Sequence, residues 1–321
     1  MKAAPGTRRE FLSAGIGALA GVWMHARAGA ADGPAAAPRA LAEIEARVGG
    51  RVGVLALDTG SGRELAHRPD ERFAMCSTFK WALAAAVLAR ADRGLLSLDE
   101  RLSFGHGDLL EFAPVTRVRV AEGSMTAGDL ARAIVTVSDN TAANLLLARI
   151  GGPGAFTEYV RSLGDCATRL DRDEPSLNGN EPGDPRDTTT PRAMVGLMRR
   201  VLCGDALSPA GRARLLGWMR ACETGRERLR AGLPQEWDVG DKTGTGRRGA
   251  SNDVAIAIPP GRAPILVAAY LSDSNAKPAA LSAAHAEIGR LVARECSTQT
   301  SGDARRRAPH RPATADARGR L

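Results

Sequence analysis

Lysine is scarce in this sequence, although basic residues are abundant. The 321 residues include 44 Lys and Arg, of which only Lys2, Lys80, Lys242 and Lys277 are lysines. Arginine keeps its proton inside a protein, whereas burial can tune a lysine amine to act as a base. The few lysines are therefore candidates for chemistry that arginine cannot perform.

Histidine and cysteine are also few. The five histidines are scattered without the spacing of metal ligands. This distribution argues against zinc chemistry and against a serine–histidine–aspartate triad, and we expect neither a metal nor another cofactor. The five cysteines form neither a regular disulfide framework nor a C-x-x-C metal pair, and their odd number leaves at least one unpaired. A serine nucleophile in this chain would need a base other than histidine.

The N-terminal apolar run, Phe11 to Met24, is too short and too rich in Gly and Ala for a membrane span. Arg8 and Arg9 precede it, and small residues suited to cleavage follow around position 28. This pattern is typical of a twin-arginine export signal, which we predict over residues 1–31. Its removal would leave a periplasmic protein without a stable membrane anchor; an uncleaved anchor is the alternative.

The excess of positive charge is confined to the two ends of the chain. Residues 1–31 carry four basic side chains against one acidic, and residues 297–321 carry six against two. Subtracting both from the formal net charge of +8 leaves about +1 for the remainder, which predicts no nucleic-acid partner. Residues 297–321 have no Leu, Ile, Val or aromatic residue before the last position, so we predict a disordered tail.

Between the two charged ends lies the body of the chain, roughly residues 39–296. Hydrophobic periodicity predicts strands at both ends of this body and helices between them. Residues 51–68 and 251–273 each read as strand, turn, strand, and "VGDKTGTG" predicts another strand just before the second pair. Helical periodicity covers 39–48, 277–296 and, between the strands, 77–92, 126–150, 153–163, 191–202 and 208–220. We therefore expect an α/β plus all-α fold, in which an antiparallel sheet flanked by helices receives an all-helical insertion.

One long segment breaks this regularity. Residues 165–190 contain "RDEPSLN" and several Pro and Gly residues, but no extended hydrophobic period. Loops longer than about 12–15 residues within a compact domain are usually functional or disordered. The polar motif favours a functional loop.

Three short motifs occur in order along the chain. "STFK" at 77–80 puts a serine at a helix start and a lysine about one turn later on the same face. "SDN" at 138–140 interrupts a helical run, where polar side chains are costly unless they face polar partners. "KTG" at 242–244 lies on a predicted strand. Each motif alone is weak, but the ordered set is specific.

With Glu174 and Asn178 between the second and third motifs, the sequence resembles the class A serine β-lactamases over essentially the whole body. "SLNGNEPGDPRDTTTP" is similar to the omega loop of this family, which we place at 169–187. "WDVGDKTGTG" and "ASNDVAI" are similar to its third and fourth strands. The resemblance implies hydrolysis of penicillins and cephalosporins by a monomer, and hence antibiotic resistance.

The resemblance also implies two subdomains with the active site in the cleft between them. We place a discontinuous α/β subdomain at 39–71 and 220–296, and an all-α subdomain at 72–219.

The resemblance assigns the catalytic roles. Ser77 would be the acylated nucleophile, and Lys80 and Glu174 are the two candidate bases for acylation. Glu174 would hold, with Asn178, the water that attacks the acyl-enzyme. The oxyanion would lie between the backbone N–H groups of Ser77 and Thr245.

Further residues would bind the substrate and help the leaving group. Ser138 would pass a proton to the ring nitrogen, and Lys242 would support it and attract the substrate carboxylate. Thr243 and Thr245 would donate hydrogen bonds to that carboxylate beside Gly244. Arg228 would anchor it too, because Ser251 stands where many relatives have an arginine; alternatively, Arg228 is one more solvated arginine.

Asn140 would contact the acylamide of the substrate, or else form only an interhelix hydrogen bond. Phe112 would flank the cleft, or else belong to the core. Arg172 and Asp187 match an ion pair that closes the omega loop, and the role of Asp139 is structural.

One departure concerns a disulfide that relatives active on carbapenems often carry. Cys76 matches one partner, but the other position is Gly246, so the bridge cannot form and carbapenem hydrolysis loses support.

Two alternatives share part of the motif set. A penicillin-binding D,D-peptidase or a β-lactam-sensing domain would be acylated without rapid turnover. The D,D-peptidase lacks the deacylating glutamate, so Glu174 and Asn178 favour hydrolysis. A sensing domain would normally need an attached transmembrane segment, and we identify none beyond the export signal.

Overall fold

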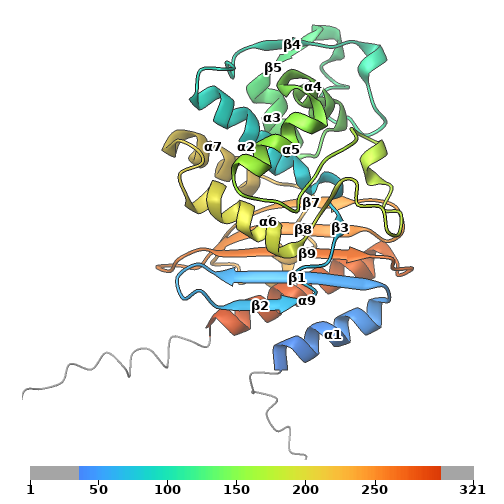
Figure 1. Cartoon of the computed structure of the whole chain (residues 1–321), viewed down its shortest axis with the longest axis vertical. Helices are drawn as coiled ribbons and strands as arrows, with labels where there is room; N and C mark the ends of the chain where they lie inside the picture. Colours follow the sequence, from blue (N-terminus) through green and yellow to red (C-terminus); the bar gives the residue numbers. More distant parts are fainter. Residues whose placement is uncertain (1–35, 298–321) are drawn as a thin grey trace, which may run out of the picture. The chain divides into compact units, whose positions relative to one another are not determined.

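The structure is a computed structural model that describes residues 36–297 (Figure 1). The predicted signal peptide at 1–31 lies outside the described residues. The predicted tail at 297–321 also lies outside them, except for its first residue, Ser297, where the last helix ends.

A five-stranded antiparallel sheet forms the base of the fold, with strand order β2-β1-β9-β8-β7. The two ends of the body meet where β1 pairs with β9, for example Val54 opposite Ala269. This pairing confirms the shared antiparallel sheet that the sequence predicted. The strands are β1 Arg51–Asp58, β2 Glu64–His67, β7 Asp238–Thr245, β8 Ser251–Ile258 and β9 Ile265–Ser272.

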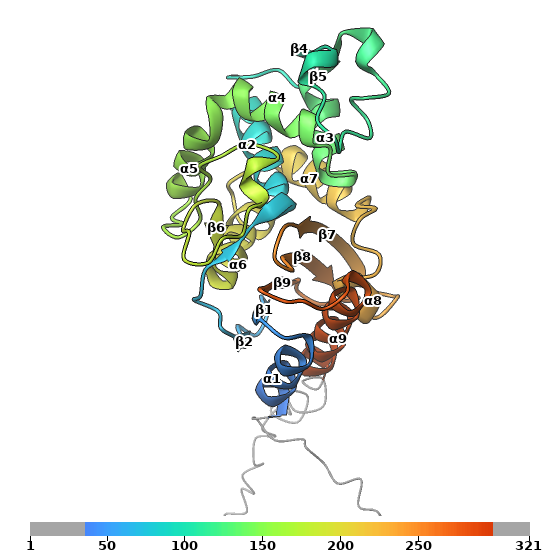
Figure 2. The same ribbon diagram turned by 90° about the vertical axis from the view of Figure 1, so that its right-hand side faces the viewer.

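Helices from both ends of the body cover one face of this sheet (Figure 2). These helices are α1 Ala36–Val48, α8 Leu229–Gly232 and α9 Pro278–Ser297. Alternate residues of β1, such as Val52 and Val54, pack with Ile44 of α1 and Ile288 of α9 in one apolar cluster. Strands β1, β8 and β9 are buried on both faces, which explains why their sequences are nearly continuous apolar runs.

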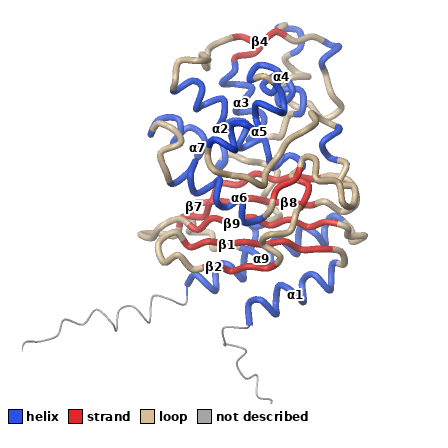
Figure 3. Tube along the Cα trace, in the orientation of Figure 1, coloured by secondary structure: helices blue, strands red, loops and turns tan. Residues whose placement is uncertain are grey.

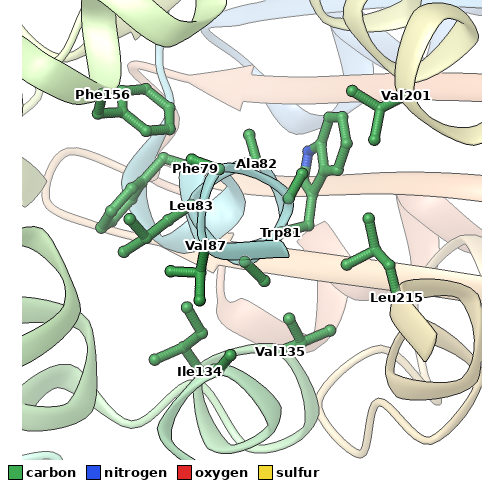
Figure 4. Close-up of a cluster of buried hydrophobic side chains, with 14 of the residues drawn as sticks. Phe79, Trp81, Ala82, Leu83, Val87, Ile134, Val135, Phe156, Val201 and Leu215 are labelled. Atoms are coloured by element: carbon green, nitrogen blue, oxygen red, sulfur yellow. The ribbon is translucent and has the colours of Figure 1, made fainter. Parts of the chain in front are cut away.

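Helix α2, Phe79–Asp92, lies on the other side of the sheet and is enclosed by the helical part of the chain. Figure 4 shows Phe79 of α2 beside Phe156, and Val87 of α2 facing Ile134. A helix that is apolar on all sides belongs to a core. Lys80 lies on this helix and is fully buried, so its ammonium group requires polar partners within the core.

The remaining helices follow the predicted order, and they are α3 Ala127–Thr136, α4 Asn140–Ile150, α5 Gly152–Ser162, α6 Pro191–Met198 and α7 Pro209–Arg220. The predicted helical run 126–150 is interrupted before Asn140, as the "SDN" motif indicated. Asp139 caps α4 by accepting a hydrogen bond from the Ala142 N–H. Helix α6 continues as a π-helical turn over Arg199–Cys203.

Several short elements had no sequence signal. Two short antiparallel pairs, β3 with β6 and β4 with β5, consist of β3 Phe73–Ala74, β6 Thr188–Thr189, β4 Arg101–Ser103 and β5 Ser124–Thr126. Strands of two or three residues cannot show the alternation that identifies a strand. The β3–β6 pair matters for the site, because it joins the end of segment 165–190 to the chain just before Ser77. Figure 3 shows most of this segment as loop. Within residues 36–297, no helix combines the length and apolar character needed to cross a membrane.

Candidate active site

Ser77 lies in a short 3-10 turn, Cys76–Thr78, immediately before α2. Strand β7 runs very close to this turn: a Cβ at Gly244 would lie 2.7 Å from the Met75 carbonyl oxygen. Only glycine permits that approach. Asn252 Nδ2 donates to the same carbonyl at 3.1 Å, and Cys76 adopts a φ of 45°, so the backbone before the serine is held in an uncommon conformation.

Lys80 is surrounded by oxygen atoms. Its Nζ lies 2.9 Å from Glu174 Oε1 and 2.9 Å from the Ser138 carbonyl oxygen, and it also donates to Asn140 Oδ1. Burial lowers the pKa of the Lys80 amine, while the Glu174 carboxylate raises it. The lysine is thus placed to exchange a proton with its neighbours.

Glu174 connects the serine, the lysine and Asn178. Ser77 Oγ donates to its Oε1 at 3.2 Å, and Asn178 Nδ2 donates to its Oε2 at 2.6 Å. Glu174 is only 2% exposed. Residues separated by about a hundred positions in the sequence therefore meet at one carboxylate.

Asn144 positions Glu174, and sequence reasoning missed it. Its Oδ1 accepts from the Glu174 N–H at 2.9 Å, and its Nδ2 donates to the Glu174 carbonyl oxygen at 2.8 Å. The available signal was an amide within an apolar helix, four residues after Asn140 and so on the same face.

The segment that carries Glu174 is fixed at its base. Arg172 Nε donates to Asp187 Oδ2 at 2.5 Å, and Asp187 Oδ1 accepts the N–H groups of Asp171 and Arg172. The Met75 N–H donates to the Asp187 carbonyl oxygen at 2.9 Å. The expected ion pair therefore forms and ties the segment to the chain two residues before Ser77.

Asp139 joins the loop that contains Val115 and Thr116 to the start of helix α4. Its carboxylate accepts the N–H groups of Val115 and Thr116, each at 2.9 Å, and the Thr116 hydroxyl. The side chain is fully buried. This arrangement agrees with the structural role that the sequence analysis gave to Asp139.

A second lysine approaches Ser138 from the sheet. Lys242 Nζ lies 3.1 Å from Ser138 Oγ and donates to the Thr243 carbonyl oxygen at 2.8 Å. Burial lowers the pKa of Lys242 to about 8. Ser138 therefore lies between the two buried lysines, since Lys80 Nζ is 3.4 Å from its hydroxyl.

Arg228 lies against the C-terminal end of strand β7. Its Nη1 donates to the carbonyl oxygens of Gly244 (2.9 Å) and Asn252 (2.6 Å), and its Nη2 donates to Thr245 Oγ1 (2.7 Å). The structure thus places a guanidinium beside the hydroxyls of the "KTGT" strand. Thr224, which the sequence analysis did not identify, hydrogen-bonds through its hydroxyl to the Thr243 hydroxyl.

Phe112 and Asn140 are neighbours, because the Phe112 carbonyl oxygen accepts the Asn140 N–H at 2.9 Å. The Phe112 side chain is 52% exposed, so the alternative that it belongs to the core is wrong. Asn140 does form an interhelix hydrogen bond, to Lys80. That bond uses only the Oδ1 atom of Asn140, so the amide nitrogen can still contact the substrate.

The cysteine prediction is confirmed. All five cysteines are free, and Cys76 is buried. A Cβ built at Gly246 would lie 2.6 Å from Cys76 Sγ. The two positions are adjacent in space, so the missing bridge is due to the glycine alone.

Comparison with known proteins gives a consistent result. A family model described as "Beta-lactamase enzyme family" matches residues 36–296. The chain is 49% identical to β-lactamase L2 of Stenotrophomonas maltophilia over 255 residues, which is 79% of this chain and 84% of that protein. It is 48% identical to β-lactamase AST-1 of Nocardia asteroides over 252 residues, or 78% of this chain and 81% of that protein.

A solved structure of an ancestral (GNCA) class A β-lactamase is 56% identical to the chain, with a TM-score of 0.79, and the match covers 81% of this chain and 99% of that one. The antiparallel sheet flanked by helices is thus the class A fold, as the sequence predicted. A chain that matches the family model over nearly all of its described residues, at about half identity to curated members, belongs to that family: it is a class A serine β-lactamase, a hydrolase that opens the β-lactam ring through a serine acyl-enzyme.

Proposed function

We propose that the chain hydrolyses penicillins and cephalosporins, with Ser77 as the acylated residue. The observation that carries this proposal is the Glu174 carboxylate, which lies within hydrogen-bonding distance of Ser77, Lys80 and Asn178. A nucleophile, a candidate base and a site for a polarised water are thereby combined.

In the acylation step, Ser77 Oγ attacks the lactam carbonyl carbon while its proton passes to Glu174 or Lys80. The negative oxygen that forms is stabilised by the N–H groups of Ser77 and Thr245. The C–N bond then breaks, Ser138 donates its hydroxyl proton to the nitrogen, and the proton that left Ser77 passes to Ser138 through Lys80, whose Nζ lies 3.4 Å from the Ser138 hydroxyl. Lys242 Nζ lies 3.1 Å from Ser138 Oγ, and its positive charge stabilises the negative charge that develops on this oxygen as the proton leaves.

In the deacylation step, a water held by Glu174 and Asn178 attacks the ester carbonyl. Glu174 accepts a proton from this water, the bond to Ser77 Oγ breaks, and the proton passes from Glu174 to Oγ, 3.2 Å away, which regenerates both the serine and the carboxylate. Asn144 keeps the carboxylate in place through its two hydrogen bonds to the Glu174 backbone.

The substrate carboxylate binds along the C-terminal end of strand β7. Lys242 supplies positive charge, Thr243 and Thr245 supply hydroxyl donors, and Arg228 adds a guanidinium that already contacts the Thr245 hydroxyl. Gly244 lets the strand lie close to the serine turn.

Asn140 and Phe112 form the opposite wall, where the substrate acylamide would lie. Phe112 is exposed enough to contact it, and Asn140 shares its oxygen with Lys80.

The two alternatives predict a different fate for the acyl-enzyme. A penicillin-binding D,D-peptidase would retain the acyl group, because it lacks a glutamate beside the ester, and a β-lactam-sensing domain would likewise bind covalently without turnover. Glu174 is held at that place by Asn144 and Asn178. Hydrolysis is therefore the better-supported function.

We also propose how the protein is organised and where it acts. Residues 1–31 direct twin-arginine export to the periplasm, and the mature enzyme acts there as a monomer without a membrane anchor. Segment 169–187 is the omega loop, within an all-α subdomain at 72–219 that faces the discontinuous α/β subdomain. The β-lactam substrates of the enzyme are small molecules, and no metal, cofactor or nucleic acid takes part in the reaction.

Steady-state hydrolysis of nitrocefin, benzylpenicillin, cefotaxime and imipenem tests the proposal. We expect turnover of the first three and little of imipenem. Ser77→Ala should lower kcat on the order of a thousandfold or more, and Ser61→Ala, in an exposed turn, should have no effect. A single stoichiometric acylation without turnover would instead identify a penicillin-binding protein or sensor.

A further inference from the structure

Residues 178–186 form a loop segment that the hydrophobic core does not hold. Leu177 before it and Asp187 after it are buried, but no residue between them is. Residues 180–186 line one side of a cavity of about 340 Å³, so this part of the chain has little packed against it. Because apolar packing is sparse here, the position of the loop segment depends on its hydrogen bonds.

Two residues of the loop segment hydrogen-bond to the turn that joins β7 to β8, residues 246–250. The Asn178 carbonyl oxygen accepts the Arg247 N–H at 3.1 Å. Asn180 Nδ2 donates to the Arg247 carbonyl oxygen at 3.1 Å and lies 3.4 Å from the Arg248 carbonyl oxygen. The turn is therefore bound to the loop segment through both backbone groups of Arg247.

The Asn180 side chain also reaches the end of strand β9. Its Oδ1 lies 3.1 Å from Ser272 Oγ. The Ser272 hydroxyl has a single proton and a second acceptor, Asp273 Oδ2 at 3.0 Å, so the bond from Asn180 to Arg247 is the less contested link. Asn180 has a φ of 53°, a left-handed conformation that asparagine adopts more readily than most residues.

This link joins the two halves of the proposed deacylation site. The turn follows Thr245, whose N–H is assigned to the oxyanion, and the loop segment begins at Asn178, which is assigned to the water. Attack on the ester requires the water and the oxyanion donors at one carbonyl group, so the distance between Asn178 and Thr245 must be fixed. Ser77 is held separately, through the close approach of Gly244 and the hydrogen bond from Asn252. Acylation therefore depends less on the link than deacylation does.

We propose that Asn180 is a positioning residue for deacylation. Its hydrogen bond to Arg247 fixes the loop segment against the β7–β8 turn, and this sets the place of the Asn178 amide and its water relative to the acyl ester. Glu174 is not its target, because Asn144 fixes the Glu174 backbone independently. The inference rests on the proposed function and adds to it a residue that the sequence analysis did not identify.

The test measures acylation and deacylation separately, with benzylpenicillin and the full chain. For a two-step acyl-enzyme reaction, kcat/KM reports the steps up to acylation. Intact-mass spectra of samples quenched at saturating substrate give the acylated fraction of Ser77. Dividing kcat by this fraction gives the deacylation rate constant, whichever step is slower. A general structural defect would instead lower kcat/KM as well.

Two substitutions remove the link without straining the backbone. Asn180→Gly deletes both contacts and tolerates the positive φ, and Asn180→Asp keeps the acceptor for Ser272 but places an oxygen against the Arg247 carbonyl. We expect each to lower the deacylation rate constant by about threefold to tenfold, with kcat/KM within about twofold of the original protein. Glu181→Ala, at the exposed next position, should change neither quantity. An unchanged deacylation rate constant in both Asn180 variants, or an equal fall in kcat/KM, would overturn the proposal.

Hydrogen exchange tests the link without reference to activity. The Arg247 N–H should exchange at least about threefold faster in Asn180→Gly than in the original protein, and Glu181→Ala should leave its exchange unchanged. Equal exchange in Asn180→Gly would overturn the assignment of Asn180 as the link. Absence of benzylpenicillin turnover by the original protein would overturn the proposed function and this inference with it. Turnover by the original protein, with unaltered deacylation in the Asn180 variants, would overturn this inference alone.

Discussion

Replacing Arg228 by alanine tests the proposed anchor for the substrate carboxylate. The guanidinium contacts the carbonyl oxygens of Gly244 and Asn252 and the Thr245 hydroxyl at 2.6–2.9 Å, so its position is fixed before substrate arrives. One charge-assisted hydrogen bond contributes about 1.5–3 kcal/mol. At a tenfold change per 1.4 kcal/mol, Arg228→Ala should lower kcat/KM for penicillins by about ten- to a hundredfold.

The loss should appear mainly in KM, because the carboxylate lies away from the bond that breaks and is bound alike in ground and transition states. The assay is steady-state hydrolysis of benzylpenicillin. Thermal unfolding is measured in parallel, because the substitution also leaves the carbonyl oxygens of Gly244 and Asn252 without this donor.

Arg226→Ala is the matched control, since Arg226 is exposed and two residues away. It should leave kcat/KM unchanged. If both variants remain within about twofold of the original enzyme, Arg228 is not the anchor, and the carboxylate depends on Lys242 and the hydroxyls.

Three further predictions concern the catalytic serine and its surroundings. Glu174→Ala should leave a persistent benzylpenicillin adduct on Ser77 in intact-mass spectra, and unimpaired turnover would contradict the deacylating role. Gly246→Cys should form a disulfide with Cys76 after a small shift, since a Cβ there would lie 2.6 Å from the thiol sulfur. The gain in stability is at most about 5 kcal/mol by loop-closure entropy, seen as a reductant-sensitive Tm; finding both thiols free would refute it. Burial lowers the pKa of Lys242 to about 8, so its positive charge is present below that pH and lost above it. The kcat/KM for benzylpenicillin should therefore fall as pH rises through 8, and a flat profile to pH 10 would rule this out.

The sequence predicted most of the sheet and the long helices because each has a period that its residues reveal. Ser77, Lys80 and Glu174 could be named in advance because each lies in a short motif with a restricted spacing. The structure brings these three side chains into contact.

The supporting residues could not be predicted in the same way. Asn144 and Asn252 act by hydrogen-bonding to backbone groups that are distant in the sequence, and such contacts leave no local pattern. Arg72 is similar, because its partners Ala167 and Thr188 lie at the two ends of a loop without periodicity. The role of Arg228 rested on a resemblance, since composition alone cannot distinguish it from its arginine neighbours.

The order of strands in the sheet has a consequence for biosynthesis. Among the strands of residues 36–297, β9 is the last to leave the ribosome, yet it lies between β1 and β8 near the centre of the sheet. The nascent chain therefore carries β1 without its central neighbour for more than two hundred residues of synthesis. Such long-range pairing is slow and leaves strand edges exposed to aggregation while it is incomplete. Strand β7, which carries Lys242, is joined to β1 only through β8 and β9, so the sheet that places Lys242 beside Ser138 is complete only after β9 docks. Activity should therefore arise in a single late step after translation.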